Sequence, residues 1–265
     1  MIDLIQGDCL NVLRCISDES IDLVVTSPPY DNLRTYNGNI EQWNFDKFKD
    51  IAKELHRVLK KGGIIVWVVG DQTVNGSESG TSFKQALYFK EIGFNLHDTM
   101  IYRKLNYVPL THNRYEQEFE YMFCFSKGKP KTFNPIKIPC KYAGTETWGS
   151  VSFHKTKDSG LVSCGKKKVN DYKQRGNIFE YLTNKSKETK GHPAPFPEQL
   201  VYDQIISWTN ENDTVLDPFM GSGTTGKMCK LLNRNFTGIE IDKAYFDIAK
   251  ERINSVENDN FDDLD

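Results

Sequence analysis

The strongest constraint on the fold is an apolar run that stops at two prolines. The run Ile21–Thr26 predicts a buried strand. Pro28 and Pro29 have no N–H groups to donate to a sheet, so the strand must end before them. The loop Ser27-Pro28-Pro29-Tyr30 therefore lies at the end of a strand, where open α/β sheets bind ligands. Its hydroxyl, carbonyls and aromatic ring suit a flat ring bearing an amino group, although alone it is also compatible with an ordinary proline-rich turn.

A glycine-rich turn near the end of the chain indicates a second part of the same site. The segment Thr214–Asp217 predicts a strand, and Gly221 and Gly223 follow it in a turn that leads into a helix. A second predicted strand, Asn235–Glu240, ends in an acid that lies 17 positions after Gly223. This spacing is close to the roughly 20 positions that separate the glycine turn from the ribose-binding carboxylate in Rossmann-like sites.

Together, the two motifs resemble those of the DNA amino-methyltransferases, which methylate exocyclic amines with S-adenosylmethionine. The TSPPY form, Thr26 to Tyr30, most resembles the cytosine-N4 members, whereas DPPY is more typical of the adenine-N6 members. The catalytic loop precedes the glycine loop, which resembles the circularly permuted order called the β class. The resemblance covers nearly the whole chain. It implies S-adenosylmethionine as cofactor and double-stranded DNA as substrate.

The resemblance also implies the site residues. Leu4–Cys9 looks like the strand and acid that contact the adenine of the cofactor, and His192–Pro197 looks like the segment that precedes the cofactor loop. The predicted cofactor contacts are Asp8, Cys9, Thr26, His192, Phe196, Pro197, Asp217, Pro218, Phe219, Gly221, Ser222, Gly223, Thr224, Thr225, Glu240 and Ile241. The predicted catalytic residues are Ser27, Pro28, Pro29 and Tyr30.

The chemistry of the substrate explains these catalytic residue types. The lone pair of an exocyclic amine is delocalised into the ring, and it must become localised before the nitrogen can attack a methyl group. The Ser27 hydroxyl and the Pro28 carbonyl are candidates to accept both amine hydrogens, and Tyr30 would stack on the base. No covalent nucleophile is required, and we expect Pro139-Cys140 to be structural. Since the amine is inaccessible inside a duplex, the base must flip into the pocket.

Alternating strand and helix patterns predict an α/β fold with a Rossmann-like, doubly wound and mainly parallel sheet. The runs Asn95–Arg103 and Phe119–Phe125 are expected to pair as an antiparallel hairpin. We divide the chain into a catalytic part (1–126), a target-recognition region (127–190), a cofactor-binding part (191–255) and an acidic tail (256–265). The helix that begins at Asp46 is predicted to stop at Lys60, before Lys61-Gly62-Gly63.

Composition argues against a membrane protein and a cysteine-bound metal site, and it shows where the basic charge lies. The chain contains no apolar run approaching the ~18 residues of a membrane span and no leader pattern, so we expect a cytoplasmic protein. Its six cysteines form no CxxC pair, so no metal site is expected. The net charge is only −2, but the segment from Lys127 to Lys190 contains 15 basic and 5 acidic residues. This asymmetry indicates phosphate binding, and the predicted DNA contacts are Arg34, Lys166, Lys167 and Lys168.

Three functions are therefore compatible with the sequence. The leading hypothesis is a site-specific methyltransferase acting on the N4 amine of cytosine in double-stranded DNA. The second is an adenine-N6 enzyme of the same fold, and the third is a catalytically silent protein that binds DNA and the cofactor. A separate restriction endonuclease is a candidate partner, and both a monomer and a homodimer are compatible with the sequence.

Overall fold

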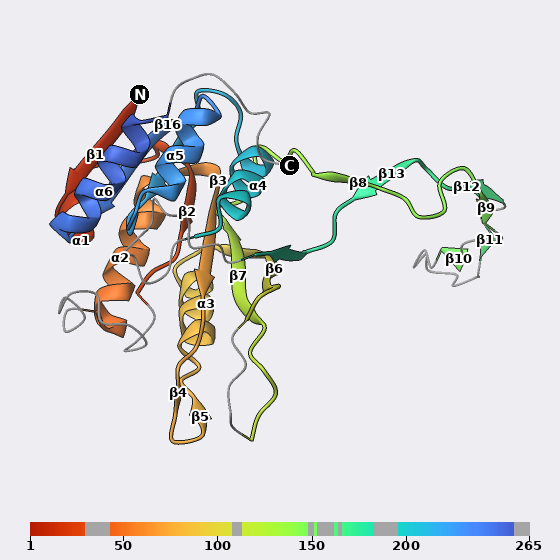
Figure 1. Ribbon diagram of the computed structural model, residues 1–265, viewed down its shortest axis with the longest axis horizontal. Helices are drawn as coiled ribbons and strands as arrows, with labels where there is room; N and C mark the ends of the chain where they lie inside the picture. The colour runs from red at the N-terminus through yellow and green to blue at the C-terminus, as the bar shows by residue number, and fades with distance from the viewer. Residues whose placement is uncertain are drawn as a thin grey trace. The chain divides into compact units, whose positions relative to one another are not determined.

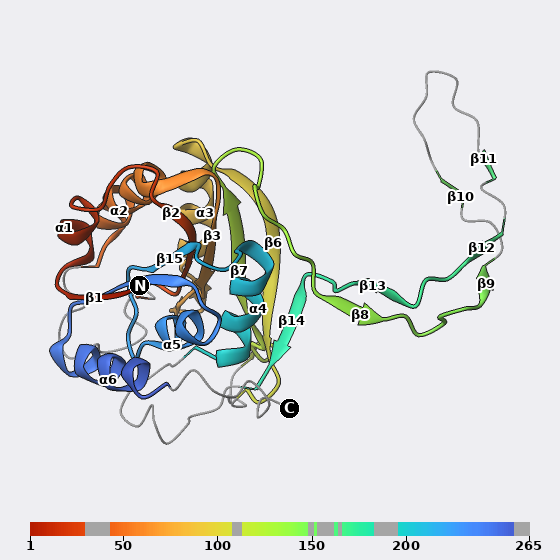
Figure 2. The ribbon, with the colours of Figure 1, turned by 90° about the horizontal axis from the view of Figure 1, so that it is seen from above.

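The computed structural model describes residues 1–29, 43–107, 113–147, 151–152, 162–163, 166–182 and 196–256. The chain divides into two compact units, which Figures 1 and 2 show in two views. Unit 1 comprises residues 1–134 and 177–265, and unit 2 comprises residues 135–176.

The described residues of unit 1 form an eight-stranded sheet with the order β1-β16-β15-β2-β3-β7-β6-β14. Neighbouring strands from β1 to β3 are parallel, β7 is antiparallel to both β3 and β6, and β14 is parallel to β6. The strands are, in this spatial order, Ile2–Gln6, Asn235–Glu240, Thr214–Asp217, Ile21–Thr26, Leu59–Val69, Phe119–Ser126, Asn95–Lys104 and Ile178–Tyr181.

Helices cover both faces of this sheet. Helix α2 contacts both α1 and α3, and these three helices lie on one face of the sheet, whereas α4, α5 and α6 form the layer on the other face (Figure 2). Their bounds are Cys9–Leu13, Phe45–Val58, Thr81–Glu91, Glu198–Trp208, Thr224–Leu231 and Lys243–Asn254, respectively. The predicted doubly wound, mainly parallel sheet is therefore confirmed, as is the pairing of β6 with β7. No helix in the described part of the chain is long and apolar enough to cross a membrane.

Aromatic packing between β3, β7 and the first helical layer forms the core. Trp67 of β3 is fully buried, and its ring centroid lies 5.2 Å from that of Phe89 on α3. Phe89 also packs against Phe125 of β7 at 4.6 Å and Phe48 of α2 at 5.3 Å. The Trp67 indole N–H donates to Gln85 Oε1 at 2.8 Å, so its polar group is satisfied inside the core. The central strands are therefore packed on this face against the helical layer.

The boundary between α2 and β3 differs from the prediction. The helix ends at Val58 rather than Lys60, and β3 begins immediately at Leu59, which pairs with Ile21 of β2. Gly62 adopts a φ of +82°, and the register between β2 and β3 shifts nearby. Pairing with β2 therefore overrides the local helix-stop pattern, and the glycines lie inside an irregular strand.

Unit 2 is a two-stranded antiparallel ribbon with three paired segments. Strand β8 (Lys137–Pro139) pairs with β13 (Tyr172–Gln174), β9 (Glu146–Thr147) pairs with β12 (Lys167–Lys168), and β10 (Val151–Ser152) pairs with β11 (Val162–Ser163). Among the residues of this unit whose solvent exposure the structure describes, every one is exposed or partly exposed. Unit 2 spans fewer residues than the predicted segment 127–190, because the chain after residue 176 forms β14, which pairs with β6 at the edge of the large sheet. A further short hairpin, β4 (Thr73–Val74) with β5 (Ser77–Glu78), follows β3 in unit 1.

Candidate active site

The carboxyl ends of five parallel strands lie along one edge of the sheet, and the predicted site residues follow them. Asp8 comes shortly after β1, Glu240 and Asp217 end β16 and β15, and Ser27 follows β2. Asp71 follows β3 at the same edge. The topology therefore brings together two motifs that are almost 200 positions apart in the chain, because β2 and β15 are neighbours.

Asp217 joins the two motifs directly. Its Oδ1 accepts the hydroxyl of Thr26 at 2.7 Å, and its Oδ2 accepts the hydroxyl of Thr225 at 2.7 Å. The backbone N–H of Phe219 also donates to Oδ1, at 3.1 Å. The side chain is 2% exposed, and burial raises the pKa of Asp217 to about 6 despite these three hydrogen bonds. Asp217 thus ties the residue before Ser27 to the glycine turn and its helix.

These contacts revise the expected role of Asp217. Cofactor binding alone would predict that Asp217→Ala leaves the fold almost unchanged. Removing this carboxylate would instead leave two buried hydroxyls and one amide without their acceptor, which is costly in a protein interior. The sequence could identify the acid but not its partners, because Thr26 is 191 positions away.

Glu240 connects the glycine turn to the end of the next strand. Its Oε2 accepts the backbone N–H of Gly221 at 2.9 Å, and its Oε1 accepts that of Asp242 at 2.8 Å. The side chain is 8% exposed, and burial raises the pKa of Glu240. Each carboxylate oxygen has two lone-pair sites, so each can still accept one further donor. This arrangement suits the recognition of two neighbouring hydroxyl groups.

The glycine turn has a conformation that its sequence requires. Gly221 and Gly223 have φ values of +51° and +81°, which are unfavourable for residues with a Cβ. A Cβ on Gly223 would also lie 2.8 Å from the Cβ of Ala249 on α6. Gly223 is the N-cap of α5, so the turn leads directly into the amino terminus of a helix.

Arg252 of α6 supports this turn from behind and was missed by the sequence analysis. Its guanidinium donates to the backbone carbonyl of Ser222 at 2.5 Å and to the hydroxyls of Ser222 and Thr224 at 3.1 and 3.4 Å. It also pairs with Glu198 of α4 at 3.1 Å, and Lys227 pairs with the same carboxylate at 2.8 Å. Ser222 and Thr224 are therefore engaged by the protein itself. Sequence spacing gave no signal for these contacts, because the arginine lies on a different helix.

Asp8 and Cys9 lie where the chain leaves β1. Asp8 is the N-cap of α1, and it also pairs with Lys47 of α2 at 2.6 Å. Partial burial tends to raise the pKa of Asp8, but its hydrogen bonds to Lys47 and the helix amides outweigh this effect and the pKa is lowered. Cys9 is buried, which raises the pKa of its thiol to about 12 and makes it an unreactive packing residue.

The remaining predicted residues differ in exposure and in their place in the fold. Ser27 and Pro29 are partly buried and Pro28 is buried, whereas Tyr30, Arg34 and His192 lie outside the described residues. Phe219 packs edge-on against Trp43, with ring centroids 5.4 Å apart; Trp43 was not predicted. Pro218 is buried, Phe196 is partly buried, Pro197 is the N-cap of α4, and Ile241 is 41% exposed. Lys166, Lys167 and Lys168 lie in unit 2, where Lys166 pairs with Glu146 at 3.3 Å.

Comparison with known proteins agrees with this geometry. Residues 21–251 match the family model for N6 and N4 enzymes described as DNA methylase. The chain is 51% identical over 253 residues to the orphan methyltransferase M.BamHII of Bacillus amyloliquefaciens, with 90% of each chain covered.

Solved structures show the same fold. The cytosine-N4-specific PvuII DNA methyltransferase superposes with a TM-score of 0.71 at 23% identity, covering 97% of this chain and 88% of the other. The complex of M1.HpyAVI with SAM gives a TM-score of 0.60 at 26% identity, covering 95% of this chain and all of the other. The fold, the adjacent motifs and these matches lead to one assignment: the chain belongs to the family of N6 and N4 DNA methylases.

Proposed function

We propose that this protein transfers a methyl group from S-adenosylmethionine to the N4 amine of a cytosine flipped out of double-stranded DNA. The observation that carries the proposal is the hydrogen-bonded link from Thr26 through Asp217 to Thr225. It holds the Ser27-Pro28 segment beside the glycine turn, so an amine at the first can face a cofactor at the second. Such fixed placement is the main contribution that a protein makes to a reaction of this kind.

The residues at the glycine turn fit this cofactor. Glu240 would accept the two ribose hydroxyls with the lone pairs that Gly221 and Asp242 leave available. Phe219 and Trp43 provide an aromatic surface beside the turn, and Asp8 lies at the neighbouring strand end. When bound, S-adenosylmethionine supplies a methyl group activated by a sulfonium charge.

The Ser27-Pro28 segment would prepare the amine. The Ser27 hydroxyl and the Pro28 carbonyl would accept the two amine hydrogens and draw the lone pair out of conjugation with the ring. Pro28 is buried two positions after the anchored Thr26, so its carbonyl needs little reorganisation. Tyr30 is outside the described residues, and its stacking on the base remains a prediction. Asp217 acts by positioning, since it is buried and already accepts hydrogen bonds from Thr26, Thr225 and Phe219.

Cytosine is favoured over adenine by the serine of the TSPPY motif. The structural neighbour PvuII methyltransferase is named cytosine-N4-specific, which supports the same choice. An adenine-N6 enzyme remains the second candidate, because N6 and N4 enzymes share this family. The test is nucleoside mass spectrometry of DNA from cells that express the protein, with N4-methylcytosine as the expected product. N6-methyladenine would select the second candidate.

A catalytically silent binding protein is the third candidate. Tritium transfer from labelled S-adenosylmethionine to DNA, measured beside calorimetric cofactor binding, separates it from an enzyme. Cofactor binding without transfer to any DNA would contradict our proposal.

Unit 2 is the proposed target-recognition region, with Lys166, Lys167 and Lys168 as phosphate contacts. Arg34, outside the described residues, remains a predicted DNA contact. Acting on chromosomal DNA, the enzyme would work in the cytoplasm. A partner endonuclease remains a prediction, and the relative M.BamHII is named an orphan methyltransferase.

A further inference from the structure

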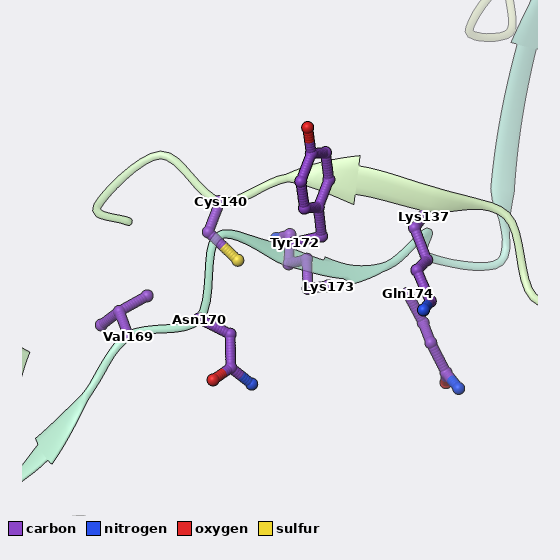
Figure 3. A pocket seen from close by; sticks show the side chains of 7 residues that line it. All are labelled: Lys137, Cys140, Val169, Asn170, Tyr172, Lys173 and Gln174. Carbon is purple, nitrogen blue, oxygen red and sulfur yellow. The ribbon is translucent and has the colours of Figure 1, made fainter. Parts of the chain in front are cut away.

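The β8–β13 segment of unit 2 presents three polar side chains on one side of a narrow ribbon. Gln174 and Lys137 are directly opposed across the two strands, so their side chains share a face. Asn170 precedes β13 and lines the same open hollow, which is bordered by Lys137, Cys140, Val169, Asn170, Tyr172, Lys173 and Gln174. Figure 3 shows Lys137, Asn170 and Gln174 projecting to the same side.

These three side chains are available to a ligand. Each is exposed, and none makes a side-chain hydrogen bond or ion pair with another residue in the described part of the chain. Lysine offers only donors, whereas asparagine and glutamine each offer a donor pair and an acceptor. A polar partner with a matching pattern of donors and acceptors would satisfy them.

The charge of the unit indicates a polyanion as this partner. Residues 135–176 contain nine basic and three acidic residues, although the whole protein has a net charge of −2. Lys167 and Lys168 lie on β12, the next paired segment along the ribbon, and Lys173 lies at the position of β13 that faces away from Gln174. The three polar side chains are therefore flanked by cations.

The two-stranded form of the unit is compatible with the major groove of duplex DNA. The major groove admits a two-stranded β-ribbon, and only there do all four base pairs display distinct donor and acceptor patterns. Glutamine and asparagine match the N6 and N7 edge of adenine, and lysine matches O6 and N7 of guanine. Gln174, Asn170 and Lys137, which project to the same side of β8–β13, are of these types.

We infer that the β8–β13 ribbon enters the major groove, where Gln174, Asn170 and Lys137 read base edges while Lys167 and Lys168 bind phosphates. This inference rests on the proposed function, because it assigns the residues that choose the methylated site. Gln174 allows the most specific test. A glutamate in its place would accept a hydrogen bond from the N4 amine of cytosine, whereas glutamine pairs with the N6 and N7 edge of adenine.

The first experiment measures site choice with Gln174→Glu. Parent and variant methylate a library of random duplexes, and the methylated molecules are sequenced. We expect one position outside the methylated base to lose its preference for adenine by about ten- to a hundredfold and to shift toward cytosine. Gln174→Ala should relax the same position without creating a new preference. Parent-like site choice in both variants would overturn the inference.

The second experiment tests the groove with the parent protein. Replacing adenine and guanine near the target with their 7-deaza analogues removes the N7 acceptors of the major groove and leaves the minor groove unchanged. We expect binding to the target to weaken by about ten- to a hundredfold, and Lys137→Ala should be less sensitive to the guanine analogue. Equal binding of normal and substituted DNA would overturn the inference.

Two lysine variants provide the controls. Lys168→Ala should weaken binding to all sequences and reduce the slope of log affinity against log salt by about 0.9, with site choice unchanged. Lys61→Ala removes an exposed charge at the start of β3 in unit 1 and should change neither quantity. If the parent methylates no DNA at all, the proposed function fails; if it methylates and the Gln174 variants choose the same sites, only this inference fails.

Discussion

The two units of this protein use polar side chains in opposite ways. In unit 1, Asp217 and Glu240 are nearly buried and bonded to the protein's own backbone and hydroxyls. In unit 2, every residue whose solvent exposure the structure describes is exposed or partly exposed. Lys137 and Gln174 are both exposed and lie opposite each other across the ribbon. A reaction site needs groups fixed before the substrate arrives, whereas a reading surface needs groups left for the ligand to pair with. Substitutions in unit 1 should therefore alter the stability of the protein, cofactor binding or methyl transfer. Substitutions in unit 2 should alter the affinity for DNA and the choice of the methylated sequence.

Asp217→Ala should have the largest effect and would show how strongly unit 1 depends on its buried bonds. We expect the free energy of unfolding to fall by about 3 kcal/mol or more, because Thr26, Thr225 and Phe219 lose their acceptor. Urea denaturation followed by circular dichroism measures this loss. Asp247→Ala, which removes an exposed carboxylate of α6, is the matched control. Equal stability of the two variants would contradict the assigned role.

The pH dependence of stability offers a second test of Asp217. The pKa of this carboxyl is about 6 in the folded protein, against about 3.9 in an unfolded chain. The folded state therefore binds the proton more tightly, so this contribution to stability is fully present below pH ~4 and is lost as the pH rises through 6. Relative to Asp217→Asn, which cannot titrate, the parent should lose on the order of 3 kcal/mol between pH 4 and pH 7. A constant difference between the two proteins would argue against a raised pKa.

Glu240→Ala should affect cofactor binding more than the fold. We expect S-adenosylmethionine affinity to fall about ten- to a hundredfold, because a charge-assisted hydrogen bond contributes roughly 1.5–3 kcal/mol. Calorimetric titration measures the affinity, with Asp247→Ala again as the control. Unchanged affinity would remove Glu240 from the proposed cofactor site.

Ser27→Ala should affect the chemical step alone. Loss of one acceptor for the amine hydrogens is expected to slow single-turnover methyl transfer by about ten- to a hundredfold. Cofactor affinity should stay near that of the parent, since the hydroxyl is proposed to contact the base. Rapid-quench transfer of labelled methyl groups gives the rate, and a rate equal to that of the parent would exclude this hydroxyl from catalysis.

Replacing Lys166, Lys167 and Lys168 together by alanine should, of all these variants, change the stability and cofactor binding of unit 1 the least. We expect weaker DNA binding at all sequences and a smaller salt dependence, by about 0.9 in slope for each phosphate that is no longer bound. Cofactor affinity should be unaffected, because these lysines lie in unit 2. Fluorescence anisotropy at several salt concentrations tests this, and an unchanged slope would show that the cluster is only a solvated surface.

Several features of the site could be predicted from the sequence. The strands Ile21–Thr26, Thr214–Asp217 and Asn235–Glu240 have the predicted bounds, since prolines, glycines and acids mark their ends. The support from Arg252 and the ion pair of Asp8 with Lys47 could not be predicted. They join residues from separate helices, and single-sequence patterns report only local periodicity.

The sequence by itself determined the alternation of strands and helices, the two loops that end buried strands, and the concentration of basic charge in one segment. These depend on local sterics, hydrophobic periodicity and composition. Only the tertiary structure decided that β2 lies beside β15, that Asp217 is bonded to both loops, and that Gln174 faces Lys137 across a ribbon. Strand order and cross-strand register depend on which distant surfaces bury one another, and this is settled only when the whole chain packs.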